Sequence, residues 1–186
     1  MVAIVERSSV NLPNALTLGR LLAVPLFVVL LINDNGSTEW RVLLAAVYLG
    51  ACITDLVDGH LARARNQVTD FGIQADPIAD KALVGTALIG LSVLSELPWW
   101  ATVVILGREL AVTGLRLLVR RHGLIPASRG GKLKSLSQNT AVTLYLLPLT
   151  GLLAEVRLPV LMIAVVATVV SGADYAAQAA RLRKGN

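Results

Sequence analysis

The chain has 186 residues, of which 55% are hydrophobic and only 16% are charged. This composition is too apolar for an ordinary soluble domain of that length, and it predicts a polytopic membrane protein. The 17 Lys and Arg residues exceed the 12 Asp and Glu residues, but no soluble basic module or aromatic-interleaved patch accompanies them. We therefore expect a lipid bilayer, and no nucleic acid, around this protein.

Six apolar runs follow one another along the chain, each close to the roughly 20 residues that a helix needs to cross a bilayer core of about 30 Å. Helices satisfy their backbone hydrogen bonds internally, so helices are expected for all six runs. No long polar linker separates the runs, which predicts a single domain over residues 1–186. The runs cover approximately residues 15–32, 40–63, 72–94, 98–119, 133–153 and 158–180. The expected fold is an all-α membrane protein with six transmembrane helices.

The segments between these runs differ in charge on the two sides of the membrane. Residues 33–38, 95–98 and 154–157 contain acids and turn formers but few cations. The positive-inside rule therefore places both termini and the other loops in the cytoplasm. Trp40, Trp99 and Trp100 would lie at the opposite face, as expected for an interfacial aromatic belt. The cations that set this topology are Arg65, Arg120, Arg121, Arg129, Lys132, Lys134, Arg181, Arg183 and Lys184.

Four aspartates lie where lipid would otherwise be expected, two in the second run and two near the start of the third. Each charge at bilayer depth costs about 2.5–3.5 kcal/mol, so this group needs a compensating partner. At about 100° per residue, Asp55 and Asp58 lie about 60° apart on their helix. Asp76 and Asp80 lie about 40° apart on theirs, so each pair occupies one face. Two facing helices could bring all four carboxylates together.

Carboxylate oxygens are the ligands that hard divalent cations prefer, and two such ions about 3.5–4 Å apart can clamp a phosphoryl group. Counting about 1.5 Å per residue from Trp40, Asp55 lies about 22 Å along the helix, in the cytoplasmic third of the membrane. Small residues near the carboxylates would leave room for a substrate. They are Gly59, Ala62 and Gly72.

A second group of charges, all but one of them cations, lies in the fourth run and just beyond the loop that follows it. Arg108 and Arg116 lie within the apolar run 98–119, where a cation needs an anion. A bound phosphate would meet that need, but Glu109 lies about 20° from Arg116 around the helix and could form an ion pair with it. Lys132 and Lys134 could bind the same phosphate or could equally be loop charges that set the topology.

The spacing of the aspartates resembles the full signature of the CDP-alcohol phosphatidyltransferase family. The matching pattern is Asp55-x2-Asp58-Gly59-x2-Ala62-Arg63-x8-Gly72-x3-Asp76-x3-Asp80. The resemblance implies a six-helix membrane fold, a homodimer, and two Mg²⁺ or Mn²⁺ ions held by Asp55, Asp58, Asp76 and Asp80. It also implies that Asp80 takes the proton from the hydroxyl of the acceptor alcohol.

The same resemblance implies CDP-diacylglycerol as the donor substrate. Snorkelling alone could explain Arg20, and Arg63 by itself would be a topology charge at a helix end. The residues that the resemblance assigns to this substrate are Asn14, Thr17, Arg20, Gly59, Ala62, Arg63, Thr69 and Gly72.

Four further stretches resemble the branch of the family that uses glycerol 3-phosphate as acceptor: residues 13–20, 76–81, 107–116 and 131–138. In that branch the acceptor phosphate would be bound by Arg108, Arg116, Lys132 and Lys134. Acceptors of related enzymes, namely inositol phosphate, serine and phosphatidylglycerol, remain open. An ion-coupled transporter is the alternative of another class, because carboxylates within a membrane can also bind and release cations.

Overall fold

The computed structural model describes residues 12–64, 70–119 and 129–184 of the chain. Within these ranges the side chains of residues 12–17, 56, 58–64, 70–75, 129, 183 and 184 are not part of the description. Every regular element in the described ranges is a helix. The all-α class predicted from the apolar runs is therefore confirmed for the described part of the chain.

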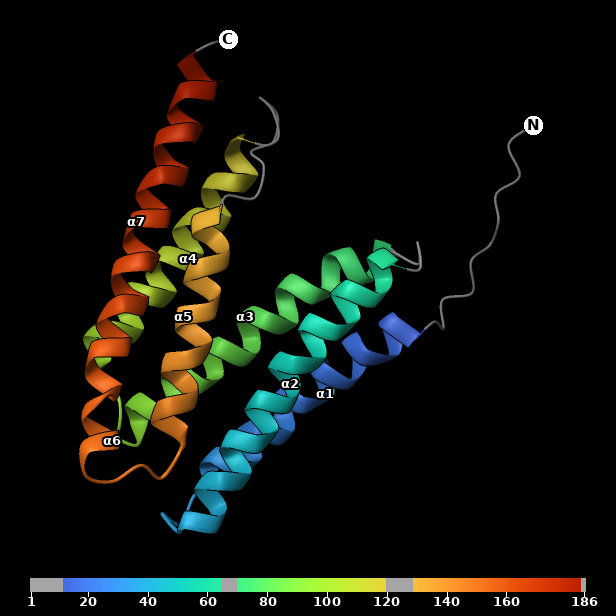
Figure 1. The fold of residues 1–186 in the computed structure, drawn as a ribbon. Helices are drawn as coiled ribbons and strands as arrows, with labels where there is room; N and C mark the ends of the chain where they lie inside the picture. The colour runs from blue at the N-terminus through green and yellow to red at the C-terminus, as the bar shows by residue number, and fades with distance from the viewer. Residues whose placement is uncertain (1–11, 65–69, 120–128, 185–186) are drawn as a thin grey trace. The chain divides into compact units, whose positions relative to one another are not determined.

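Six long helices and one short one make up the described chain (Figure 1). Four of the long helices, α1 to α4, begin and end within three residues of the predicted apolar runs, and α7 continues four residues beyond the end of its run. The elements are α1 Leu12–Ile32, α2 Thr38–Ala64, α3 Asp70–Val93, α4 Trp99–Val119, α5 Arg129–Leu146, α6 Leu152–Glu155 and α7 Arg157–Lys184.

The fifth run departs from its prediction, because α5 ends at Leu146 instead of continuing to Leu153. Pro148 accounts for this end, since a proline disfavours helical geometry in the residue before it and cannot donate to the carbonyl four residues earlier. Gly151 follows with a φ of 59°, in the left-handed region that favours glycine, and the short α6 begins directly after it. The prediction of a continuous helix to Leu153 was wrong because it relied on hydropathy, which does not register the effects of Pro148 and Gly151 on the backbone.

The contacts within the described chain form two compact units, which divide within α3 between residues 86 and 87. In the first unit, α1 packs along α2. Phe27 and Tyr48 are fully buried there, with their ring centroids 5.8 Å apart. Leu31 of α1 and Leu44 of α2 are also buried. The pairing of α1 with α2 fixes which residues of the two helices can meet at the end nearer the aspartates.

In the second unit, α7 packs against both α4 and α5 (Figure 1). Its buried core includes Ile105 of α4, Val142 of α5 and Leu161 of α7. Where α3 gives way to α4, the buried hydroxyls of Ser92 and Thr102 share a hydrogen bond of 2.7 Å. Three helices from distant parts of the sequence are thereby held side by side.

One segment of the described chain, Leu152–Leu182, is long and apolar enough to cross a membrane, and Leu18–Ile32 forms a shorter apolar stretch. Large apolar side chains are also exposed along α1, α2, α4, α5 and α7. Soluble proteins rarely expose apolar surface on this scale, so these faces suit contact with lipid.

Candidate functional site

In the first unit, Arg20 lies close to the carboxylates of two of the four aspartates, Asp55 and Asp76. Its side chain is buried, and its Nη1 atom forms an ion pair with Oδ1 of Asp55 on α2. The same Nη1 atom lies 3.8 Å from Oδ1 of Asp76 on α3. Arg20 is on α1, so three helices contribute to this contact. Snorkelling alone does not describe Arg20, because its charge is buried against two carboxylates.

Asp80 lies one turn after Asp76 on α3, where it is half-buried. It is close enough to Tyr48 and Cys52 of α2 for its charge to act on both, and the charge of Asp55 also acts on Cys52. Tyr48 and Cys52 hydrogen-bond to each other through their side chains. Asp55 and Asp80 therefore border one region of the first unit, although they come from different helices.

The chemistry of this region fits a divalent cation. Oxygens of Asp55 and Asp76 converge on a single cationic nitrogen, and carboxylate oxygens are the preferred ligands of Mg²⁺ and Mn²⁺. Among the described side chains, no three acidic, His or Cys residues form a group that could hold a metal. Asp58 is outside that set, so the predicted four-aspartate site stays a prediction.

For several residues expected to bind CDP-diacylglycerol, the structure describes the helix on which they lie but not their side chains. Asn14 and Thr17 lie on α1, and Gly72 lies on α3. Their side chains, like those of three residues on α2, are outside the described set, and Thr69 lies outside the described residues altogether. The three on α2 are Gly59, Ala62 and Arg63.

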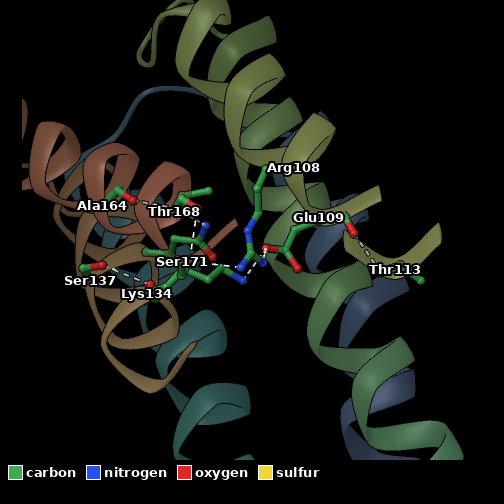
Figure 2. A network of polar contacts seen from close by, with 9 residues as sticks. Arg108, Glu109, Thr113, Lys134, Ser137, Ala164, Thr168 and Ser171 are labelled. Carbon is green, nitrogen blue, oxygen red and sulfur yellow. Dashed lines mark hydrogen bonds and ion pairs between the residues drawn. The ribbon is translucent and has the colours of Figure 1, made fainter. Parts of the chain in front are cut away.

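Glu109 of α4 joins two of the four cations expected to bind the acceptor phosphate (Figure 2). Its Oε1 atom forms an ion pair with Nζ of Lys134 on α5 and lies 3.0 Å from Nη1 of Arg108. Two cations thus share one carboxylate, and the cluster keeps a net positive charge. Such a charge in a partly buried setting suits an anionic ligand.

Arg108 also reaches across to α7. Its Nη2 atom donates a hydrogen bond of 3.0 Å to Oγ of Ser171, which in turn donates to the carbonyl of Thr168 over 3.1 Å. Gln138 of α5 donates from Nε2 to the hydroxyl of Thr168 over 2.8 Å. The arginine therefore lies on a hydrogen-bonded layer built between α5 and α7, which Figure 2 shows.

The other two expected phosphate ligands lie apart from this cluster. Arg116 is exposed on α4, with its guanidinium carbon 5.7 Å from the centre of the Tyr175 ring. Lys132 is exposed on α5. Among the described residues, Glu109 forms ion pairs with Arg108 and Lys134 and with neither Arg116 nor Lys132.

The ion pair between Glu109 and Arg116 that the helix geometry allowed is not formed. Glu109 contacts Arg108 and Lys134 instead. The two residues share a helix face, but seven residues separate them by about 10 Å along the axis. Lys134, on the adjacent helix α5, is close enough to Glu109 to form the ion pair instead.

The similarity of the whole chain to known proteins agrees with the aspartate spacing. The family model for CDP-alcohol phosphatidyltransferases matches residues 10–170. The chain belongs to the CDP-alcohol phosphatidyltransferase family. All four aspartates and both clusters described above, apart from Ser171, lie within the matched residues.

Relatives within the CDP-alcohol phosphatidyltransferase family cover most of this chain. A protein of Mycobacterium tuberculosis strain H37Rv, named probable phosphatidylglycerophosphate synthase, is 52% identical over 172 residues, which are 92% of this chain and 82% of the relative. A protein of Bacillus subtilis strain 168, named CDP-diacylglycerol–glycerol-3-phosphate 3-phosphatidyltransferase, is 38% identical over 179 residues. That alignment covers 89% of this chain and 93% of the relative.

A third relative carries a different name. A cardiolipin synthase (CMP-forming) of Streptomyces coelicolor is 36% identical over 120 residues, which are 62% of this chain and 54% of the relative. Its alignment is shorter and its identity lower than those of the two preceding proteins. The family is therefore shown over nearly the whole chain, whereas the relatives' names differ in the acceptor that they indicate.

Sequence reasoning on this phosphatidyltransferase missed the contribution of α7. Ser171 and Thr168 interrupt an apolar helix that we interpreted only as a membrane span, and Glu109 contacts Arg108 and Lys134 and not Arg116, the partner that was considered for it. A polar pair in an otherwise apolar helix was the available signal. The partner of Ser171 on α4 and that of Thr168 on α5 could not be identified without the packing of the helices.

Proposed function

We propose that this family member transfers the phosphatidyl group of CDP-diacylglycerol to sn-glycerol 3-phosphate, forming phosphatidylglycerophosphate and CMP. The main support for glycerol 3-phosphate as the acceptor is the positively charged cluster of Arg108, Lys134 and Glu109, which suits a phosphorylated alcohol. The names of the relatives from Mycobacterium tuberculosis and Bacillus subtilis support the same reaction.

Asp55, Asp58, Asp76 and Asp80 would hold two Mg²⁺ or Mn²⁺ ions. When bound, such ions neutralise charge on a diphosphate and make CMP a better leaving group. Arg20 supports this assignment, because it already draws Asp55 and Asp76 toward one point. The role of Arg20 would be to orient these two carboxylates and to face the anionic headgroup of the lipid.

Asp80 takes the proton from the acceptor hydroxyl in the proposed reaction. The hydroxyl oxygen then forms a bond to the phosphorus that carries the diacylglycerol. The bond from that phosphorus to the oxygen shared with CMP breaks, and CMP leaves with the electron pair. Positioning of both substrates contributes much of the acceleration in such phosphoryl transfers.

The donor nucleotide-lipid would lie against α1, α2 and the start of α3. Gly59 and Gly72 would allow close approach of the substrate, and Arg63 would contact its diphosphate. Asn14, Thr17, Ala62 and Thr69 complete the set that the family pattern assigns to this substrate. At the acceptor, Arg108 and Lys134 would bind the phosphate, and the exposed Arg116 and Lys132 would contribute to its binding more weakly.

Six membrane-spanning helices with both termini in the cytoplasm complete the proposal. The exposed apolar faces and the span Leu152–Leu182 support a membrane location. The concentration of Lys and Arg on one side of the sequence supports the orientation and a cytoplasm-facing site in the cell membrane. A homodimer is proposed from the family resemblance.

The test is release of CMP by purified protein in detergent with CDP-diacylglycerol and Mg²⁺. Glycerol 3-phosphate, inositol 1-phosphate, serine and phosphatidylglycerol are compared as acceptors, and Asp80→Asn is assayed beside the wild type. Turnover with glycerol 3-phosphate alone, lost in Asp80→Asn, is the expected result. Full activity of Asp80→Asn would refute the role of Asp80 as the proton acceptor.

Two other results would change the proposed function. Turnover with phosphatidylglycerol would indicate the reaction named for the relative from Streptomyces coelicolor. If no CMP is released with any of the four acceptors, the ion-coupled transporter becomes the better explanation. The detergent assay separates these classes because transport needs a sealed membrane and phosphatidyl transfer does not.

A further inference from the structure

Gly172 of α7 lies directly beneath the side chain of Arg108. A Cβ atom placed on Gly172 would lie 3.0 Å from Cγ and 3.1 Å from Nε of Arg108. Cβ atoms in proteins seldom approach other atoms this closely, and Cγ lies too near the backbone of α4 to move freely. The glycine therefore leaves a notch in α7 that the stem of Arg108 fills.

Ser171 fixes the other end of the same side chain. Its hydroxyl is buried and donates its hydrogen to the carbonyl of Thr168 over 3.1 Å. The lone pairs of Oγ are then left to accept from Nη2 of Arg108 over 3.0 Å. Because the hydroxyl hydrogen is engaged, Ser171 acts toward the guanidinium only as an acceptor.

The guanidinium is consequently held from two sides. Glu109 contacts Nη1, Ser171 contacts Nη2, and Nε is buried without a hydrogen-bond partner among the described residues. A guanidinium has more N–H groups than these contacts use, and its planar fork suits a phosphate. Glu109 and Ser171 set the plane of the fork, and the N–H groups of Nη1 and Nη2 that these contacts do not use are available in principle to a phosphate.

We propose that Ser171 and Gly172 are positioning residues that hold the Arg108 guanidinium in place for the phosphate of the acceptor alcohol. This inference rests on the proposed function, in which Arg108 binds that phosphate. Stability alone explains the arrangement poorly, because apolar residues of similar volume often stabilise a protein as well as a buried charge does. A fixed guanidinium loses less side-chain entropy when the phosphate binds.

Two variants test the inference. Gly172→Ala fills the notch and displaces the stem of Arg108, and Ser171→Ala removes one hydrogen bond without adding an atom. Gly50→Ala is the matched control, because a Cβ atom at this helical glycine of α2 meets nothing within 4 Å. Each purified protein is checked by size-exclusion chromatography and thermal unfolding in detergent before steady-state kinetics.

The expected signature is confined to the phosphate of the acceptor. KM for glycerol 3-phosphate and the inhibition constant of inorganic phosphate should rise together, by about tenfold in both Gly172→Ala and Ser171→Ala. KM for CDP-diacylglycerol and kcat should change by less than about twofold, as expected when binding energy common to ground and transition states is lost. Gly50→Ala should match the wild type.

Unchanged values of both phosphate constants in folded Ser171→Ala would overturn the inference, and so would equal changes in the constants for both substrates. Ser171→Ala keeps this test available if Gly172→Ala does not fold, because it only removes atoms. The wild-type control separates this inference from the proposed function. Absence of wild-type turnover with glycerol 3-phosphate would refute the function, whereas wild-type turnover with unaffected variants would refute only the positioning role.

Discussion

At the scale of single residues, the charges of this phosphatidyltransferase are arranged as shared contacts. Nη1 of Arg20 contacts Asp55 and Asp76, and Oε1 of Glu109 contacts Arg108 and Lys134. Each central group meets two groups of opposite charge from different helices. The free energy of each cluster therefore depends on several helices at once.

Arg20→Ala should reduce the rate of CMP release by about 100-fold, because misplaced carboxylates no longer hold the reacting groups in position. It should also lower the midpoint of thermal unfolding, since Asp55 and Asp76 lose their shared cation. Mg²⁺ should restore part of that midpoint by neutralising the same carboxylates. Thermal unfolding in detergent with and without Mg²⁺ measures this effect.

Arg41→Ala is the control for that experiment. It removes another contact of the first unit, in which Nε of Arg41 lies 2.8 Å from Oδ2 of Asp34. Its midpoint should fall without recovery on addition of Mg²⁺. An equal response of the two variants to Mg²⁺ would contradict a specific role of Arg20 at the aspartates.

Lys134→Met and Lys132→Met should differ although the two residues lie one turn or less apart on α5. Lys134 is buried in the Glu109 cluster, so its loss should raise KM for glycerol 3-phosphate by about tenfold. Lys132 is exposed, and exposed charges contribute little. Steady-state kinetics compare them, and equal effects would favour a common role for both lysines.

At the scale of elements, the connection between α5 and α7 depends on Arg157. Pro148 cannot donate to the carbonyl of Leu144, and Nε of Arg157 donates to that carbonyl instead, over 3.0 Å. Arg157 also donates from Nη2 to the carbonyl of Leu147 over 2.6 Å, and its guanidinium lies over the ring of Tyr145. Arg157 thus supplies the carbonyl of Leu144 with the donor that Pro148 lacks, and the carbonyl of Leu147 with a second donor besides the backbone N–H of Leu149.

Arg157→Ala should lower the free energy of unfolding by about 1–3 kcal/mol, because the carbonyl of Leu144 loses the donor that replaces Pro148. Denaturant unfolding in detergent measures the change. Arg181→Ala, on the exposed surface near the end of α7, serves as the matched control and should have no comparable effect. Equal stability of both variants would show that water satisfies these carbonyls without cost.

The sequence predicted elements better than contacts between them. The positions of the six long helices followed from hydropathy, and the end of α5 was missed only because the length of the apolar run outweighed Pro148 and Gly151. A helical wheel relates residues of one helix, so it correctly paired Asp76 with Asp80 on one face. It carries no information about the neighbour of Glu109 on α5 or of Arg108 on α7.

At the scale of the whole molecule, orientation in the membrane is the property that the charge distribution predicts. Asn35 is exposed in the segment between α1 and α2, which the positive-inside rule places outside the cytoplasm. Arg183 lies in the cation-rich C-terminal region, which the same rule places in the cytoplasm. These two positions should therefore be reached by reagents from different sides of the membrane.

Introduced cysteines test this orientation in a Cys52→Ser background. In intact cells, an impermeant maleimide should label Asn35→Cys and leave Arg183→Cys unlabelled until the membrane is permeabilised. Labelling of both variants before permeabilisation would contradict the proposed even number of spans. The reverse pattern would place the termini, and with them the site, on the outer face.

The single carboxylate oxygen that serves both Arg108 and Lys134 makes their contributions thermodynamically inseparable. Removal of either cation lets Glu109 interact more strongly with the one that remains, which weakens that cation as a ligand for phosphate. Each single substitution therefore reports the loss of one cation together with the reorganisation of its neighbour, and the two effects cannot be summed. In the proposed function, the two cations and their carboxylate would therefore act as one anion receptor, with a joint affinity that neither cation would possess alone.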